Sequence, residues 1–125
     1  MKFKVGKRNN CIPDGEYDAI VNEIRRIQTY RRPALEFHFE IADGEHRGTE
    51  LKGFCNADYE SFTNRTKLYQ WYEKVTGDSL EADSMLDTDQ FKEKVLQVRV
   101  ESKTSKKTGN KFSNVVEILG VKCEL

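Results

Sequence analysis

The sequence predicts a mostly β fold that carries one helix. Two stretches, Leu35–Ile41 and Val95–Val100, alternate apolar and polar residues as half-buried strands do. Between them, from Arg65 to Val75, the apolar residues are instead spaced at helical intervals. Strands at both ends and a helix in the middle therefore define the fold class.

The size of the chain fits one domain. It has 125 residues and a mass of 14.5 kDa, enough to bury a core without disulfide or metal support. Three cysteines at wide spacing argue against a disulfide framework or a Cys-x-x-Cys metal site. We expect a single domain over residues 1–125, with loose ends at 1–11 and 120–125.

The first strand is expected over residues 16–28. It follows Pro13, Asp14 and Gly15, which are typical of a turn. Its apolar residues first share one face and then change phase, from Tyr17, Ala19 and Val21 to Ile20, Ile24 and Ile27. This change predicts a β-bulge or a strong coil in a long strand.

A hairpin is expected next. Residues 35–41 place four apolar side chains on one face, with Glu36, His38 and Glu40 on the other. Residues 42–45, Ala-Asp-Gly-Glu, are a hairpin turn, and the return strand covers 48–56 with a bend at Gly53.

The helix is expected to begin at a cap formed by Ser61 or Thr63 and to end at Gly77. Trp71 fits its apolar face and is expected in the core. Residues 78–90 are acidic and irregular, and Phe91 opens a short turn.

Two further strands complete the pattern. The first, over 95–100, directs Leu96, Val98 and Val100 inward. A lysine-rich loop over 102–111 then leads to a last strand over 112–119. Three strands, a helix and two strands form the element order of a five-stranded OB-fold barrel with its helix between strands 3 and 4. An open sheet capped by one helix shares this order.

Charge is separated along the chain, although 21 basic and 21 acidic residues balance. The segments 1–32 and 101–125 are positive, and the segment 33–100 is negative. A local positive field can guide a polyanion to one face of a neutral protein.

Catalytic motifs are not apparent. Gly44, Gly48 and Gly53 are spaced for a hairpin rather than a phosphate-binding loop, and no cysteine pattern completes a zinc site around His46. Glu36, His38 and Glu40 could in principle hold a metal ion, but their alternation favours a solvated strand face over a metal site. We therefore expect neither an enzyme nor a cofactor.

Basic residues concentrate at two connections, between the first and second strands and between the fourth and fifth. In an OB barrel these two loops flank one oligonucleotide groove over strands 2 and 3. Single-stranded nucleic acid needs cations for its backbone and flat rings for its bases, and Tyr30 and Phe54 are the favoured rings. Glu36, Glu40 and Glu50 would repel phosphate, which directs the strand along the loops and Lys52. The candidate binding residues are Arg25, Arg26, Tyr30, Arg31, Arg32, Lys52, Phe54, Lys103, Lys106, Lys107 and Lys111.

Three segments resemble small phage-type single-stranded-DNA-binding proteins of the OB-fold class: Pro13–Val21, Leu35–Gly48 and Phe91–Val100. The similarity spans residues 12–119. The resemblance implies sequence-tolerant binding of single-stranded DNA, without a cofactor, during phage-type replication or recombination.

Single-stranded DNA is thus the expected partner, with replication or recombination proteins and a homo-oligomer as further partners. The alternatives are a non-catalytic protein-interaction or virion accessory module on the same barrel, and an RNA-binding version of the same groove. A basic N-terminus without an apolar run, and the lack of any long apolar stretch, predict a cytoplasmic protein (host cytoplasm if phage-encoded) that does not enter a membrane.

Overall fold

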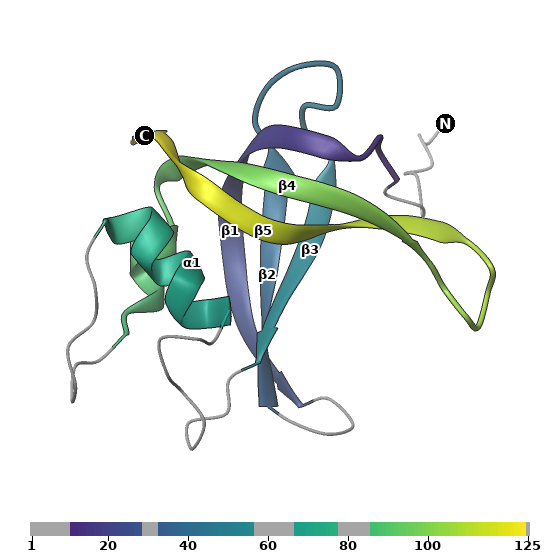
Figure 1. The fold of residues 1–125 in the computed structure, drawn as a ribbon, viewed down its shortest axis with the longest axis horizontal. Coiled ribbons are helices and arrows are strands. Elements are labelled where there is room, and N and C mark those ends of the chain that lie inside the picture. The colour runs from purple at the N-terminus through teal and green to yellow at the C-terminus, as the bar shows by residue number, and fades with distance from the viewer. Residues whose placement is uncertain (1–10, 29–32, 57–66, 78–85, 125) are drawn as a thin grey trace, which may run out of the picture.

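In the part of the chain that the structure describes, five strands form a closed ring and one α-helix lies between the third and fourth strands, as the sequence predicts (Figure 1). The structure, a computed structural model, describes residues 11–28, 33–56, 67–77 and 86–124. Around the ring the strand order is β1-β2-β3-β5-β4. The elements are β1 Gly15–Gln28, β2 Pro33–Ile41, β3 Glu50–Asn56, α1 Lys67–Thr76, the 3-10 helix η2 Thr88–Phe91, β4 Lys94–Thr104 and β5 Lys111–Glu124.

Strand β1 pairs with two neighbouring strands of the ring, β4 and β2. It pairs antiparallel with β4 from Gly15 to Ala19, and with β2 from Ala19 onward. Between Val21 and Glu23 the register shifts, as expected from the predicted bulge or coil. A bulge bends its strand and increases the local twist, so this bulge, just after Ala19 where β1 changes partner from β4 to β2, can help to close the ring.

The ring closes where β3 meets β5. Among the described strands this is the one parallel pairing, with Lys52 opposite Asn114. Gly53 lies beside this pair, and its missing side chain is what permits the close approach. A Cβ there would lie 3.0 Å from the backbone oxygen of Val115.

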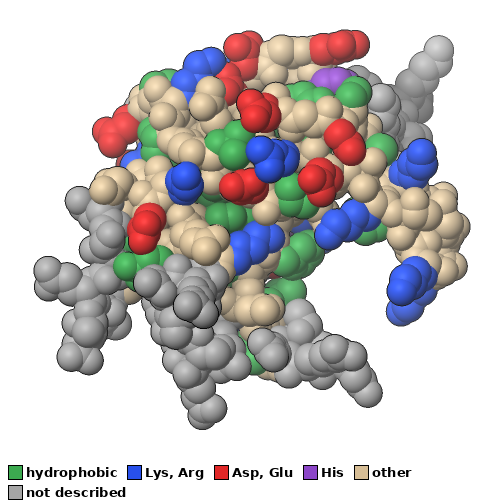
Figure 2. All heavy atoms as spheres, in the orientation of Figure 1, with side chains coloured by type: hydrophobic (Ala, Val, Ile, Leu, Met, Phe, Trp, Pro, Cys, Tyr) green, Lys and Arg blue, Asp and Glu red, His purple; other side chains and the backbone are tan. Residues whose placement is uncertain are grey.

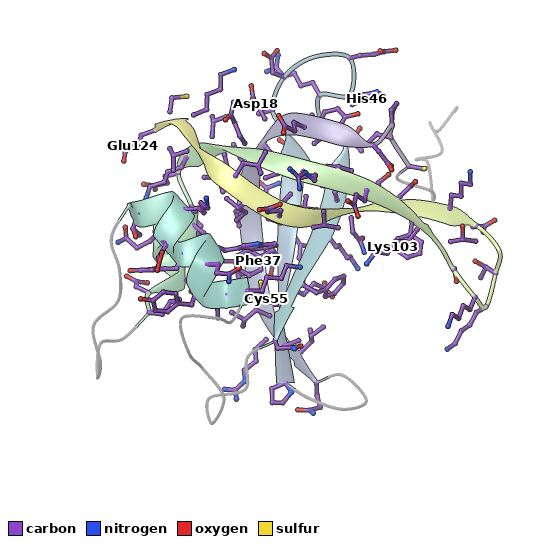
Figure 3. All side chains as sticks on the ribbon, in the orientation of Figure 1. Asp18, Phe37, His46, Cys55, Lys103 and Glu124 are labelled. Atoms are coloured by element: carbon purple, nitrogen blue, oxygen red, sulfur yellow. The ribbon has the colours of Figure 1, made fainter. Side chains whose placement is uncertain are left out.

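Aromatic rings fill one end of the interior. Phe37 and Phe39 point inward from β2, as the alternation predicts, and both are fully buried. Phe37 contacts Trp71 of α1 edge to face, with ring centroids 5.2 Å apart, and contacts Phe91 of η2 at 5.0 Å. Trp71 is 2% exposed, so its predicted place in the core is confirmed. The labelled Phe37 lies between the strands and α1 in Figure 3.

Helix α1 ends where the sequence predicts. Gly77 has a φ of 76°, in the left-handed region, and its N–H donates to the carbonyl of Glu73 at 2.8 Å. This is a glycine C-cap. The predicted caps Ser61 and Thr63 lie outside the described residues. Phe91 is the last residue of η2, bends follow at Lys92 and Glu93, and the Phe91 ring is buried against Phe37.

Strands β4 and β5 are longer than predicted. They continue to pair beyond the ring as a hairpin arm, residues 103–112, which projects at the right of Figure 1. Exposed polar side chains on β4 hide the alternation there, while backbone pairing alone maintains the strands. The expectation of a loose end at 120–125 is wrong for residues 120–124, since these residues pair with β4.

The cysteines differ in accessibility. Cys55 is buried, and this burial raises the pKa of its thiol to about 12, whereas Cys11 and Cys123 are exposed. We expect a thiol-specific reagent at neutral pH to modify Cys11 and Cys123 rapidly and Cys55 only after denaturation, because the thiolate is the reactive form. Mass spectrometry of the labelled peptides checks this. Rapid labelling of native Cys55 would contradict its burial.

No helix in the described part of the chain is long and apolar enough to cross a membrane.

Candidate nucleic-acid interface

The outer face of β2 and β3 carries the central candidates. Phe54 lies opposite Glu36, and Lys52 lies opposite His38, with all four side chains on the outside of the ring. Phe54 is 37% exposed, although its residue type normally packs inside. Phe54 thus lies on the outer face of β3 and the buried Leu51 on the inner face, so the bend at Gly53 does not turn the Phe54 ring inward.

Glu36 is compensated by its neighbours. One of its carboxylate oxygens lies 2.5 Å from Nε2 of His38 and 3.7 Å from Nζ of Lys52. Its side chain is only 15% exposed. These contacts reduce the repulsion that Glu36 would exert on a phosphate. The same ion pair also weakens the attraction of Lys52 for a phosphate.

Lys67, which the sequence analysis did not select, adjoins Phe54. Its Nζ donates to the Phe54 carbonyl at 2.9 Å and lies 4.8 Å from the centroid of the Trp71 ring. Burial lowers the pKa of the Lys67 ammonium; the Cys55 thiol opposes this shift and the charge of Lys103 adds to it. No local pattern reveals this position, because the contact joins the start of α1 to the end of β3.

The arm presents four lysines: Lys103, Lys106, Lys107 and Lys111. All four are exposed. Lys103 and Lys111 belong to the paired strands, so their predicted place in a loop is wrong; the connecting turn is shorter and carries Lys106 and Lys107. Lys103 lies near the base of the arm (Figure 3).

The tip of the arm is ordered by hydrogen bonds of its own. The Ser105 N–H donates to the Asn110 carbonyl at 2.9 Å, and the Gly109 N–H donates to the Ser105 carbonyl at 2.8 Å. Gly109 has a φ of 73°, which glycine adopts without strain. Lys106 and Lys107 are thus fixed at a tight turn rather than spread along a long loop.

Arg25 and Arg26 lie within β1, which ends at Gln28 as the predicted strand does, and they pair with Glu36 and Leu35 of β2 rather than standing in the connection itself. The strand continues this far because its backbone pairs with β2 up to Gln28. Arg25 forms an ion pair with Glu23 at 2.8 Å. The other candidates of this group, Tyr30, Arg31 and Arg32, lie outside the described residues.

The charges on this side of the molecule are unequally compensated. Arg25 and Lys52 have carboxylates within 4.0 Å, whereas within the described ranges no Asp or Glu oxygen lies that close to Lys67 or to the four arm lysines. Unpaired ammonium groups keep their full attraction for an external anion.

Acidic residues gather elsewhere. Figure 2 shows Asp and Glu side chains along the top, over the turn between β2 and β3, and Lys and Arg side chains on the arm. A hollow of about 450 Å³ is lined at this acidic end by Glu16, Asp18 and Asp43, among others. Its carboxylates oppose phosphate binding, so the hollow is not part of the candidate interface.

The structure therefore brings Lys52, Phe54 and Lys67 together, with Lys103 within electrostatic reach of Lys67. We call these four residues the Phe54 platform. Across the described ranges, no group of three His, Cys, Asp or Glu side chains is arranged to hold a metal ion.

One family model, described as "Protein of unknown function (DUF669)", matches residues 4–119. No curated protein matches the chain.

Proposed function

The chain belongs to the DUF669 family, and because that family is described as one of unknown function, we propose a function from the residues themselves: sequence-tolerant binding of single-stranded DNA. The protein acts without catalysis or a cofactor. It coats exposed strand during phage-type replication or recombination, in the cytoplasm where that strand is exposed. Replication or recombination proteins and further copies of the chain are its other candidate partners.

The observation that carries this proposal is the Phe54 platform. The Phe54 ring is 37% exposed, Lys52 lies two residues away on the same face of β3, and Lys67 of α1 donates to the Phe54 carbonyl. Proteins that bind single strands without sequence preference combine these two elements, since rings stack on bases and cations follow the phosphates. A single exposed phenylalanine without cations would not favour nucleic acid over other ligands.

The strand order supports an OB-type barrel. In that fold, oligonucleotides bind over strands 2 and 3, between the loop joining strands 1 and 2 and the loop joining strands 4 and 5. Lys52 and Phe54 are on strand β3, and the lysine-bearing arm joins β4 to β5. The candidates thus lie where this fold would use them.

A salt titration tests the proposal. If four lysines contact phosphates, the logarithm of the affinity for oligo-dT should fall with the logarithm of salt concentration at a slope of about −3, since each contact on a single strand contributes about −0.7. Fluorescence anisotropy of a labelled oligonucleotide measures it, with double-stranded DNA and poly-U as competitors. Replacing Lys106 and Lys107 with glutamate should lower the affinity for oligo-dT and make the salt slope shallower. If the protein does not bind the oligonucleotide, the alternative of a protein-interaction module remains, in which the lysines serve only to keep the protein in solution.

Phe54→Ala tests the stacking ring. A base stacked on an aromatic side chain contributes roughly 1–3 kcal/mol, so the affinity for oligo-dT should fall about five- to 150-fold. Oligo-dA and oligo-dC should lose a similar factor, because every base has a flat face. Titration of each oligonucleotide gives the ratio, and a melting curve should show little loss of stability for this exposed side chain.

Val121→Ala is the matched control, because Val121 is 36% exposed and lies near the far end of β5. It should bind as the wild type does. Equal losses in both variants, or a loss for one base only, would contradict a stacking platform at Phe54.

A further inference from the structure

The surface around Phe54 is electrically asymmetric. On its β2 side, Glu36 is the cross-strand partner of Phe54, and Glu40 lies opposite Glu50. On the other side, the ammonium of Lys67 from α1 contacts the Phe54 carbonyl at 2.9 Å. A phosphate beside this ring therefore meets carboxylates in one direction and an ammonium in the other.

Lys67 is held in place before any ligand arrives. Its Nζ donates to the Phe54 carbonyl and also lies over the face of Trp71, a ring that attracts cations and is itself buried. An ammonium has three N–H donors, so a donor remains for a ligand. Because the side chain is already ordered, an anion that binds it costs less conformational entropy than binding to a free lysine.

Within the described residues, the charge of Lys67 is also not paired directly with a carboxylate, although Glu73 and Glu117 line the same hollow as Lys67. Among the residues that the structure describes, no carboxylate oxygen lies within 4.0 Å of the ammonium of Lys67 or Lys103. Partial burial and the repulsion from Lys103 both lower the pKa of Lys67. An anion near both ammonium groups would offset this cost, because opposite charge stabilises the protonated form of each.

We infer that Lys67 binds a phosphodiester group of the strand, so that the backbone passes Phe54 on its α1 side and continues toward Lys103 and the arm. The strand thereby avoids the carboxylates of β2. This inference rests on the proposed function and adds a residue and a path to it.

Lys67→Gln tests the residue. Glutamine keeps a donor for the Phe54 carbonyl but removes the charge. Against oligo-dT, the slope of log affinity on log salt should become shallower by about 0.7, which makes the loss at about 0.1 M salt about fivefold greater than at about 1 M. Lys67→Arg should keep the wild-type slope. Lys74→Gln, an exposed position on the same helix, should change neither quantity.

Glu40→Gln tests the path without touching α1. If the backbone avoids β2, the Glu40→Gln variant binds oligo-dT with an affinity within about twofold of wild type. If the backbone instead passes over β2, the variant loses a charge repulsion, so its affinity rises about fivefold and its slope of log affinity on log salt becomes steeper. A folded Lys67→Gln variant with the wild-type slope, or a clear gain in Glu40→Gln, overturns the inference while wild-type binding still supports the proposed function. If the wild-type protein binds no single-stranded DNA, the proposed function itself fails.

Discussion

Trp71→Ala should lower the free energy of unfolding by about 3–5 kcal/mol, the usual cost of removing a large buried aromatic side chain. Trp71 is 2% exposed, and its ring packs edge to face on Phe37 at 5.2 Å and on Phe39 at 6.0 Å. With Leu68 and Val75, it is one of the α1 residues in the hydrophobic core cluster. Alanine would leave a cavity between the helix and β2, and the contacts on both sides would be lost.

Urea denaturation followed by far-ultraviolet circular dichroism measures this loss. Tryptophan fluorescence cannot serve, since the chain has a single tryptophan. Trp71→Phe is the control: it keeps an aromatic ring of smaller volume and should cost clearly less. A loss below about 1 kcal/mol for Trp71→Ala would mean that α1 does not depend on this packing.

Gly53→Ala should destabilise the protein by about 1–3 kcal/mol or more, although alanine is otherwise favoured over glycine within a strand. The added Cβ would lie 2.9 Å from Cε2 of Phe39, 3.0 Å from the Val115 carbonyl oxygen and 3.1 Å from Cη2 of Trp71. The carbonyl belongs to the backbone of β5 and cannot rotate away as a side chain can. Strands β3 and β5 must therefore separate where the ring closes.

Gly120→Ala provides the comparison, because a Cβ there meets nothing within 4 Å. Gly120 also lies in a strand, so the substitution carries the same change in backbone entropy without the clash. We expect it to be neutral or slightly stabilising in the same urea experiment. If both glycine substitutions have the same effect, the close approach at Gly53 is not what constrains it.

The helices and strands could be predicted from the sequence wherever one face of the element is apolar. The alternation of Phe37, Phe39 and Ile41 predicts β2, and the loss of phase after Val21 predicts the bulge, because burial imposes these periods. The arm could not be predicted in this way. Its outer residues face water on both sides, so nothing in the pattern of side chains records that Lys103 pairs with Phe112.

The candidate site was predictable only in part, for a similar reason. Phe54 could be assigned to the outer face because a strand has a period of two residues. The role of Lys67 depends on how α1 returns to the end of β3, and no local pattern encodes that tertiary contact. The ion pair of Arg25 with Glu23, two residues away on the same strand, leaves Arg25 less free to bind a phosphate.

The parallel pair between β3 and β5 has a consequence for the kinetics of folding. The pairings β1–β2, β2–β3 and β4–β5 join neighbours in sequence, whereas β1–β4 and β3–β5 join the two halves of the chain. Local hairpins form quickly, and contacts between distant segments form slowly because a long loop must close first. We expect the three-stranded unit and the β4–β5 hairpin to form early and their docking to limit the rate. Gly53→Ala, which acts at that junction, should then slow refolding more than it speeds unfolding in stopped-flow experiments.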